Sequence, residues 1–362
     1  MTNIGERKIR ILVVDDSFFM RQVISRMLQE EMEFTVVGTA RDGLEAIEKN
    51  KSLEPDVVTL DVEMPGLDGL GALDQMLRTR PVAVVMLSAH TGEGMGTAVQ
   101  ALERGAVECV GKPAGSVSFD LRKIQDELIE KIRAAARVPT ILLRPDLNIP
   151  LPAASPIKYS NRIPSVQNPA TFAVAVASST GGPRALHELM ARMPQNPKAC
   201  FLFVQHMAIG FTAALAKRLN DSCPFPIKEA EDGELLMQGI GYVAPGGRHL
   251  VVVKGPSGFH VAFHEGPPRH GVKPSADYLL TAVSQTFGSY SIGVVLTGMG
   301  RDGSKGLLDM RQAGAHTYAQ DESTSVVFGM PKAAIECGAA WEVLPLEQLG
   351  DSLKERLKKL EL

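Results

Sequence analysis

The sequence predicts an α/β protein of two domains, each with a parallel β-sheet that helices cover on both faces. Its 362 residues are too many for one ordinary hydrophobic core. In both halves, short runs rich in Val and Leu alternate with amphipathic stretches, the pattern of successive strand–helix units. The alternation stops between the halves, where prolines stand at positions 139, 145, 150, 152, 156, 164 and 169. We therefore expect a first domain over residues 1–136, a semi-extended linker over 137–168 and a second domain over 169–362.

The first half is expected to form a five-stranded parallel sheet. Its apolar runs predict strands at Ile9–Val14, Thr35–Gly38, Asp56–Leu60, Val82–Leu87 and Glu108–Val110. The amphipathic stretches predict helices at Phe18–Glu30, Leu44–Lys51, Leu70–Arg78, Met95–Arg104 and Leu121–Ala136. Such strict alternation favours parallel pairing, because each helix then crosses back over the sheet.

The second half is expected to be a doubly wound α/β domain. Its apolar runs predict strands at Phe172–Ala177, Cys200–Gln205, Tyr242–Ala244, Leu250–Val253 and Ile292–Leu296. Helical stretches follow several of them, including Arg184–Arg192 and Thr212–Asn220.

The composition is that of a globular protein and excludes several classes. A net charge of −3 provides no broad basic field for nucleic acid or anionic membrane. No apolar run approaches the roughly 20 residues that span a bilayer. Near the N-terminus, the apolar run Ile11–Val14 ends at Asp15, so no signal peptide is expected. The dispersed cysteines predict reduced thiols and a cytoplasmic location; they are Cys109, Cys200, Cys223 and Cys337.

Polar side chains follow four of the predicted strands in the first half. Asp15 and Asp16 follow the first strand, Asp61 the third, Ser88 the fourth and Lys112 the fifth. Carboxyl ends of parallel strands share one edge of a sheet, so these groups converge there. Clustered carboxylates call for a divalent cation such as Mg²⁺, and Lys112 and Ser88 suit the oxygens of a phosphoryl group. Each residue alone reads as an ordinary loop residue; their joint placement favours a phosphoryl site with Asp61 as nucleophile.

These residues lie in VVDDS at 13–17, LDVEMPGLDG at 60–69 and GKP at 111–113. Over about residues 8–130 the chain resembles a response-regulator receiver domain, which has a flavodoxin-like fold. The resemblance implies that Asp61 accepts a phosphoryl group from a histidine kinase. It also implies that Asp15, Asp16 and the backbone carbonyl of Glu63 help to bind Mg²⁺. Receivers usually carry an aromatic switch residue three positions before the lysine, where this chain has Cys109.

In the second half, TFAVAVASSTGGPRAL at 171–186 runs from a predicted strand directly into a predicted helix. Gly181 and Gly182 permit a sharp turn, and Pro183 suits a first helical turn. Amides at the helix start would stabilise negative charge near Ser179, as an acyl-transfer nucleophile requires. By itself the segment is also compatible with a phosphate-binding turn or a helix cap.

Two further residues follow predicted strands of this domain. His206 ends ACFLFVQHM at 199–207, and Asp302 lies in SIGVVLTGMGRDGSKG at 291–306. Serine, histidine and aspartate on three strand ends can be gathered by the fold into a triad. His260 and His264 are four residues apart, but in a strand-like segment, so no metal pair is expected there.

STGGP at 179–183, QHM at 205–207, LTGMGRDG at 296–303 and QDESTSVVFGMPKAA at 320–334 resemble the CheB family of chemotaxis protein-glutamate methylesterases. With the receiver in front, the resemblance covers almost the whole chain. It implies a hydrolase without a cofactor of its own that demethylates chemotaxis receptors and deamidates their glutamines. The implied roles are Ser179 as nucleophile, His206 as general base and Asp302 as its orienting partner, with Thr180 and the Met299 amide nearby.

The resemblance is incomplete in two places. The family usually has GAS before TGG, whereas this chain has Ala177, Ser178 and Ser179, so Ser178 is a second candidate nucleophile. VKPSAD at 272–277 replaces a run similar to HRPSVD. In neither domain do we expect nucleic-acid binding or membrane insertion.

Two other functions compete with this one. Gly298, Gly300 and Gly303 form a G-x-G-x-x-G pattern after a predicted strand, and Asp321 lies near the spacing of a ribose-binding acid, as in dinucleotide-dependent oxidoreductases. The second half is instead a binding module if Ser179, His206 and Asp302 do not meet.

Overall fold

The computed structural model describes residues 7–89, 91–112, 118–143 and 168–359. The chain divides into two compact units, Met1–Ile149 and Pro150–Leu362. Most of the predicted linker, residues 144–167, lies outside the described residues. Within the described part of that segment, Thr140–Leu143 forms a short 3₁₀ helix.

The first unit is a five-stranded parallel sheet with the order β2-β1-β3-β4-β5. Its strands are β1 Ile9–Val14, β2 Phe34–Ala40, β3 Val57–Asp61, β4 Ala83–Ser88 and β5 Glu108–Gly111. Its helices are α1 Phe18–Gln29, α2 Gly43–Leu53, α3 Gly69–Thr79, α4 Gly92–Arg104 and α5 Ser118–Ala135. The predicted number, order and parallel pairing of the elements are therefore confirmed, with boundaries that shift by a few residues.

The first four helices of this unit start where a side chain caps the first turn. Ser17, Asp42, Asp68 and Thr91 each accept a hydrogen bond from a backbone N–H three residues later. Such caps satisfy amides that have no partner within the helix. They set where each loop leaves the sheet, and so help to place the polar groups at its carboxyl edge.

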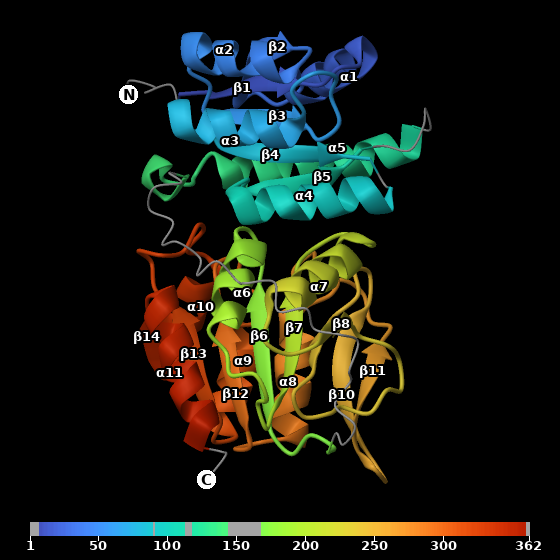
Figure 1. Cartoon of the computed structure of the whole chain (residues 1–362), viewed down its shortest axis with the longest axis vertical. Helices are drawn as coiled ribbons and strands as arrows, with labels where there is room; N and C mark the ends of the chain where they lie inside the picture. Colours follow the sequence, from blue (N-terminus) through green and yellow to red (C-terminus); the bar gives the residue numbers. More distant parts are fainter. Residues whose placement is uncertain (1–6, 90, 113–117, 144–167, 360–362) are drawn as a thin grey trace, which may run out of the picture. The chain divides into compact units, whose positions relative to one another are not determined.

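The second unit is a seven-stranded parallel sheet with the order β14-β13-β12-β6-β7-β9-β8. Its strands are β6 Ala173–Ser178, β7 Cys200–Gln205, β8 Ile227–Glu229, β9 Gly241–Val243, β12 Ser291–Val295, β13 His316–Gln320 and β14 Glu342–Leu344. Its helices are α6 Gly182–Ala191, α7 Phe211–Ser222, α8 Ala276–Thr286, α9 Ser304–Gln312, α10 Met330–Glu336 and α11 Leu346–Lys359. Helix α6 packs beside α7 and α11, and helix α9 packs beside α8 and α10. These two groups lie on opposite faces of the sheet (Figure 1).

The predicted strand at Leu250–Val253 exists but does not belong to this sheet. It is β10, His249–Gly255, which pairs with β11, Gly258–His264, in an antiparallel hairpin. The hairpin packs against α8. Leu250 and Val252 of β10 are buried, as is Val261 of β11, which pairs with Val252, whereas Val253 is exposed.

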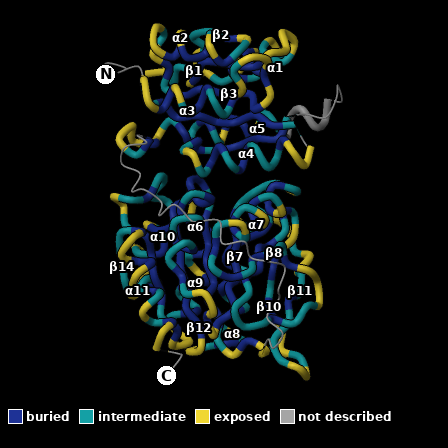
Figure 2. The backbone as a smooth tube through the Cα atoms, viewed as in Figure 1, coloured by how far each residue is buried: buried dark blue, intermediate teal, exposed yellow. Residues whose placement is uncertain are grey.

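The strand order reverses beside β6. From β6 the chain builds β7, β8 and β9 on one side, then returns to place β12 against the other side of β6. Ligands of such sheets bind where the order reverses, outside the carboxyl ends of the strands. Strands β6, β7 and β12 are buried along their length, which Figure 2 shows in dark blue for β7. Among the described residues, no helix is both long and apolar enough to span a bilayer.

Candidate functional site

The acidic groups of the first unit converge as predicted. Ligand atoms of Asp15, Asp16 and Asp61 all lie within 4.8 Å of one another. The Lys112 ammonium lies 2.7 Å from Asp15 Oδ2 and 2.6 Å from Asp61 Oδ2. Asp15 Oδ2 is buried and, despite that short distance, makes no hydrogen bond of good geometry. Three carboxylates beside one ammonium group leave negative charge uncompensated, and such an oxygen cluster fits a hard divalent cation such as Mg²⁺.

Burial raises the pKa of Asp61 to about 6, and the neighbouring Asp15 carboxylate adds to the rise while Lys112 opposes it. The Glu63 amide donates to Asp61 Oδ1 at 3.2 Å, which places Glu63 at the pocket. Ser88 is buried, and its hydroxyl donates to the Ala89 carbonyl at 3.2 Å.

Because its folded pKa is raised, Asp61 stabilises the fold below the ordinary carboxyl pKa, and this stabilisation is lost as the pH rises through about 6. Without Mg²⁺, Asp61→Asn should therefore gain stability relative to the wild type between pH 5 and pH 8. We expect a gain of about 1–2 kcal/mol once solvent screening is allowed for. Thermal unfolding of both proteins in chelator at the two pH values measures it. A difference that stays constant with pH would contradict a raised pKa.

The aromatic switch position of a receiver is occupied by a buried thiol. Burial raises the pKa of Cys109 to about 12, so the thiol stays protonated. The Lys131 ammonium donates to the Cys109 carbonyl at 2.6 Å and to Glu127 Oε1 at 2.6 Å. The Lys131 side chain of α5 thus binds the backbone of β5.

In the second unit, β6 turns sharply into α6. Gly181 has φ 76°, where a side chain is disfavoured, and an added Cβ would lie 2.6 Å from Val326 Cβ. The Gly182 amide donates to the Ser179 carbonyl at 2.7 Å, which closes the turn. Pro183 lies in the first turn of α6, as predicted.

Of the two adjacent serines, Ser178 is fully buried and its hydroxyl donates to Gln205 Oε1 at 2.8 Å. Ser179 is partly exposed beyond the strand end, and its amide donates to the Thr297 carbonyl at 3.0 Å. Successive side chains of a strand point in opposite directions, so the Ser179 hydroxyl does not share the buried direction of Ser178. This geometry favours Ser179 over Ser178 as the nucleophile.

His206 leaves β7 next to Ser179. Its amide donates to the Ser178 carbonyl at 3.1 Å, so the parallel pairing of β6 and β7 continues to their ends. His206 Nε2 lies 2.8 Å from Asp302 Oδ2, and the two side chains are 9% and 3% exposed. The structure therefore joins the histidine directly to the aspartate and places the serine on the adjacent strand end.

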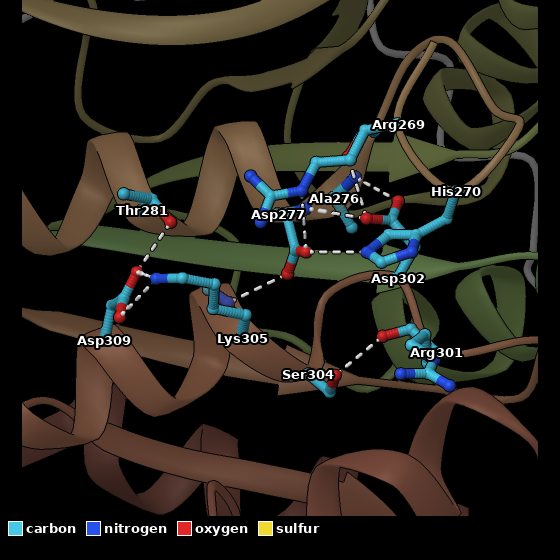
Figure 3. A network of polar contacts seen from close by, with 12 residues as sticks. Arg269, His270, Ala276, Asp277, Thr281, Arg301, Asp302, Ser304, Lys305 and Asp309 are labelled. Carbon is cyan, nitrogen blue, oxygen red and sulfur yellow. Dashed lines mark hydrogen bonds and ion pairs between the residues drawn. The ribbon is translucent and has the colours of Figure 1, made fainter.

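The Asp302 carboxylate accepts four hydrogen bonds, three of them from residues at the start of α8. Oδ1 accepts from Ser275 Oγ at 2.7 Å and from the Asp277 amide at 3.1 Å. Oδ2 accepts from the Ala276 amide at 2.6 Å and from His206 (Figure 3 shows the two amide bonds). Burial by itself would raise the pKa of Asp302, but the bonds from His206, Ser275 and Ala276 hold it below its ordinary value. The carboxylate stays ionised.

The two residues expected near an oxyanion lie on either side of Ser179. Thr180 is buried and its carbonyl accepts from Thr297 Oγ1 at 2.9 Å. Met299, which is exposed, follows Gly298, whose added Cβ would lie 2.7 Å from Ser179 Cβ. The loop after β12 therefore passes directly over the serine, and the oxyanion role of the Met299 amide stays a prediction.

The comparisons with known proteins agree on one family. The family model described as CheB methylesterase matches residues 174–353, and that of the response regulator receiver domain matches residues 11–122. The chain is 46% identical to a protein-glutamate methylesterase/protein-glutamine glutaminase of Pyrococcus abyssi, over 96% of this chain and 93% of that protein. The chain belongs to the CheB methylesterase family.

Two further relatives support the assignment of this CheB-family chain. A protein of the same name from Symbiobacterium thermophilum is 43% identical over 98% of both chains. The crystal structure of the Thermotoga maritima CheB methylesterase catalytic domain is 39% identical, with a TM-score of 0.50. It matches 52% of this chain and 99% of its own. The predicted fold class and family are therefore confirmed.

The glycine pattern of the CheB-family chain does lie between a strand and a helix, β12 and α9. However, Asp321 is occupied by its own turn: it accepts from the Thr324 amide at 3.1 Å and from the Ser323 hydroxyl. An acid held in this way is not free to bind a ribose, which argues against the oxidoreductase.

His260 and His264 of the CheB-family chain lie in β11. Among the described residues, neither belongs to a group of three metal-ligating side chains with atoms within 4.8 Å.

Sequence reasoning missed Gln205, which ties the site of this CheB-family chain together. Its Nε2 donates to the Ser179 carbonyl at 2.9 Å and to the His206 carbonyl at 3.2 Å, while Oε1 accepts from Ser178. Its only signal in the sequence is a polar residue that ends a buried strand.

Gln205→Glu replaces this donor with a carboxylate oxygen facing two carbonyls. We expect it to destabilise the second unit by about 1–3 kcal/mol and to lower kcat, because the strand ends are no longer held together. Thermal unfolding and ester hydrolysis measure the two effects. Gln238→Glu is the matched control, since Gln238 bonds to the Pro169 carbonyl at an exposed position. Equal effects of the two substitutions would contradict the role of Gln205.

Proposed function

We propose that this chain is a phosphorylation-controlled hydrolase that removes methyl esters from glutamate side chains of chemotaxis receptors and deamidates receptor glutamines. The observation that carries the proposal is the 2.8 Å contact between His206 Nε2 and Asp302 Oδ2, beside Ser179 at the reversal of strand order. The names of its relatives, protein-glutamate methylesterase/protein-glutamine glutaminase, supply the substrate class.

In the proposed reaction, His206 takes the proton of Ser179 while the hydroxyl oxygen attacks the ester carbonyl carbon. Since His206 Nε2 is bound to Asp302, Nδ1 is the nitrogen that accepts the proton. Methanol leaves with the proton from His206, and an acyl-enzyme on Ser179 remains. Water then hydrolyses the acyl-enzyme with His206 as base, releasing glutamate. With a glutamine substrate the leaving group is ammonia.

Asp302 serves this reaction as a fixed anion. Four donors surround its carboxylate, so it holds one tautomer of His206 and stabilises the imidazolium that forms. Backbone amides beside Ser179, with that of Met299 as the main candidate, would hold the oxyanion. One such donor contributes about 10²–10³-fold to kcat in comparable enzymes.

In the receiver unit, Asp61 is the proposed phosphoacceptor, and a chemotaxis histidine kinase is the proposed donor. Asp15, Asp16 and the Glu63 carbonyl would hold Mg²⁺ with Asp61, and the ion would neutralise charge on the incoming phosphoryl group. Lys112 and Ser88 would bind the phosphoryl oxygens. We also propose that the unphosphorylated receiver covers Ser179 and that phosphorylation of Asp61 uncovers it, because a site that must take a receptor side chain has to be open. The cytoplasm is the proposed location.

The direct test uses receptor fragments with radiolabelled glutamate methyl esters and, separately, with unmodified glutamines. Methanol and ammonia release are measured for the wild type and for Asp302→Asn. We expect both products, with kcat about 10⁴-fold lower in the variant because the imidazole loses its tautomer. Receptor binding without either product would indicate a binding module instead.

A further inference from the structure

Helices α8 and α9 begin beside each other. The start of α8 is bound by Asp302, from the loop before α9, and the start of α9 is bound by Asp277 of α8. Asp302, in the loop before α9, accepts from the amides of Ala276 and Asp277 in the first turn of α8 at 2.6 and 3.1 Å. Asp277 accepts in return from the Gly306 amide in the first turn of α9, at 2.9 Å. Both carboxylates are almost fully buried, at 0% and 2% exposure. The position of Asp302 therefore depends on where Asp277 holds the two helix starts (Figure 3).

The charge of Asp277 is compensated from a single loop. Arg269 Nε lies 3.2 Å and His270 Nε2 lies 3.1 Å from Asp277 Oδ2. Both residues follow β11, and the Arg269 guanidinium also lies over the Tyr278 ring, 5.7 Å from its centre. A buried carboxylate is retained only with such partners, since removing them leaves a charge without compensation.

The backbone of this loop is held in an uncommon conformation. His270 has φ 53°, in the left-handed region that residues other than glycine seldom occupy. Arg269 and Val272 exchange two backbone hydrogen bonds, at 3.1 and 3.0 Å, across it. Backbone strain persists where the surrounding structure imposes it, and it concentrates at functional sites. The conformation directs the His270 ring to Asp277.

We propose that Asp277, held by Arg269 and His270, is a positioning residue that keeps Asp302 in the orientation that binds His206. The inference rests on the proposed function, because it assigns a task to groups behind the Ser179 site. The Asp277 amide binds Asp302 directly, and the Asp277 carboxylate fixes the start of the helix that follows Asp302. The loop bearing Arg269 and His270 thereby acts on the His206–Asp302 bond without contacting substrate.

A merely structural role for Asp277 is the alternative, and the chain offers a matched control. Asp309 in α9 also joins the two helices: it accepts from Thr281 Oγ1 in α8 at 2.8 Å and pairs with Lys305 at 3.1 Å. It makes none of the hydrogen bonds to Asp302 described above. Asp309→Asn thus tests what weakened packing of α8 and α9 does by itself.

The experiment compares Asp277→Asn with Asp309→Asn in the full chain, using methanol release from labelled receptor fragments. Asparagine keeps an oxygen for the Gly306 amide but loses the charge that binds Arg269 and His270. We expect kcat to fall about 10–100-fold in Asp277→Asn with KM nearly unchanged, the effect of a small misplacement of a reacting group. The low-field ¹H NMR signal of the proton between His206 and Asp302 should weaken or shift. Asp309→Asn should keep both kcat and the signal.

Wild-type kcat and an unchanged proton signal in Asp277→Asn would overturn the inference, as would equal losses in both variants. If Asp277→Asn does not fold, Arg269→Met and His270→Gln replace it with the same expectations, and Arg269→Lys should restore activity relative to Arg269→Met. Ser179→Ala, measured in parallel, separates the two proposals. Its retention of activity would refute the proposed function, whereas an inactive Ser179→Ala beside a fully active Asp277→Asn refutes only the positioning role.

Discussion

Ser179→Ala should abolish methanol release from methylated receptor fragments, with kcat lower by about 10⁴–10⁶-fold. Ser179 is the serine that the turn between β6 and α6 leaves partly exposed, beside the His206–Asp302 pair. Without its hydroxyl no acyl-enzyme forms, and only the binding and oxyanion contributions remain. Methanol release under saturating substrate, with circular dichroism to confirm folding, measures the effect.

Ser178→Ala is the control for this experiment. The Ser178 hydroxyl is buried and bound to Gln205, so its loss should cost about 1 kcal/mol of stability and change kcat little. An inactive Ser178→Ala together with an active Ser179→Ala would make Ser178 the nucleophile and contradict the geometry of the turn.

Phosphorylation of Asp61 should raise the hydrolase activity by about 5–150-fold, the usual range for coupling between two sites of a protein. A small phosphodonor with Mg²⁺ supplies the phosphoryl group, and methanol release is followed before and after its addition. Asp61→Asn should keep the basal rate and lose the rise, since an amide cannot accept the phosphoryl group. A chelator should also remove the rise from the wild type, because the carboxylate cluster then lacks its cation.

Two results would contradict this control. If the phosphodonor raises the activity of Asp61→Asn equally, it acts elsewhere. If Asp61 becomes phosphorylated while the rate of methanol release stays at the basal value, the two domains are not coupled. Phosphorylation itself is measured independently by the mass of the intact protein.

The local hydrophobic pattern of the sequence predicted strands well where they are buried on both faces of the sheet. The bounds of β1 and β7 match the predicted ones, because each is mostly apolar and its apolar run stops at a polar residue, Asp15 after β1 and Gln205 in β7. Strands β8, β13 and β14 were not predicted: β8 and β14 have three residues each, and β13 carries His316, Thr317 and Gln320. Pairing with neighbouring strands stabilises these segments, because strands this short show little alternation of apolar and polar residues.

The sequence by itself determined the fold class and the family, and it indicates the chemistry of the two sites. The residue types that end the strands, from Asp15 and Asp61 to Ser179 and His206, indicate a phosphoryl site and a nucleophilic serine, since few other arrangements use such groups at strand ends. The two-domain organisation likewise follows from the alternation of runs. The roles of individual residues in the reaction are predictions that the substitutions above test.

Only the tertiary structure decided which groups meet and what holds them. It placed β12 against β6, brought Asp302 to His206 and bound Asp302 through Ser275 and the start of α8. It also turned Ser178 inward and put Gln205 under the site. The hydrogen bonds among these contacts join residues 26 to 96 positions apart, or depend on which face of a strand a side chain takes. Strand order and packing set both, and neither is written in the local pattern of the chain.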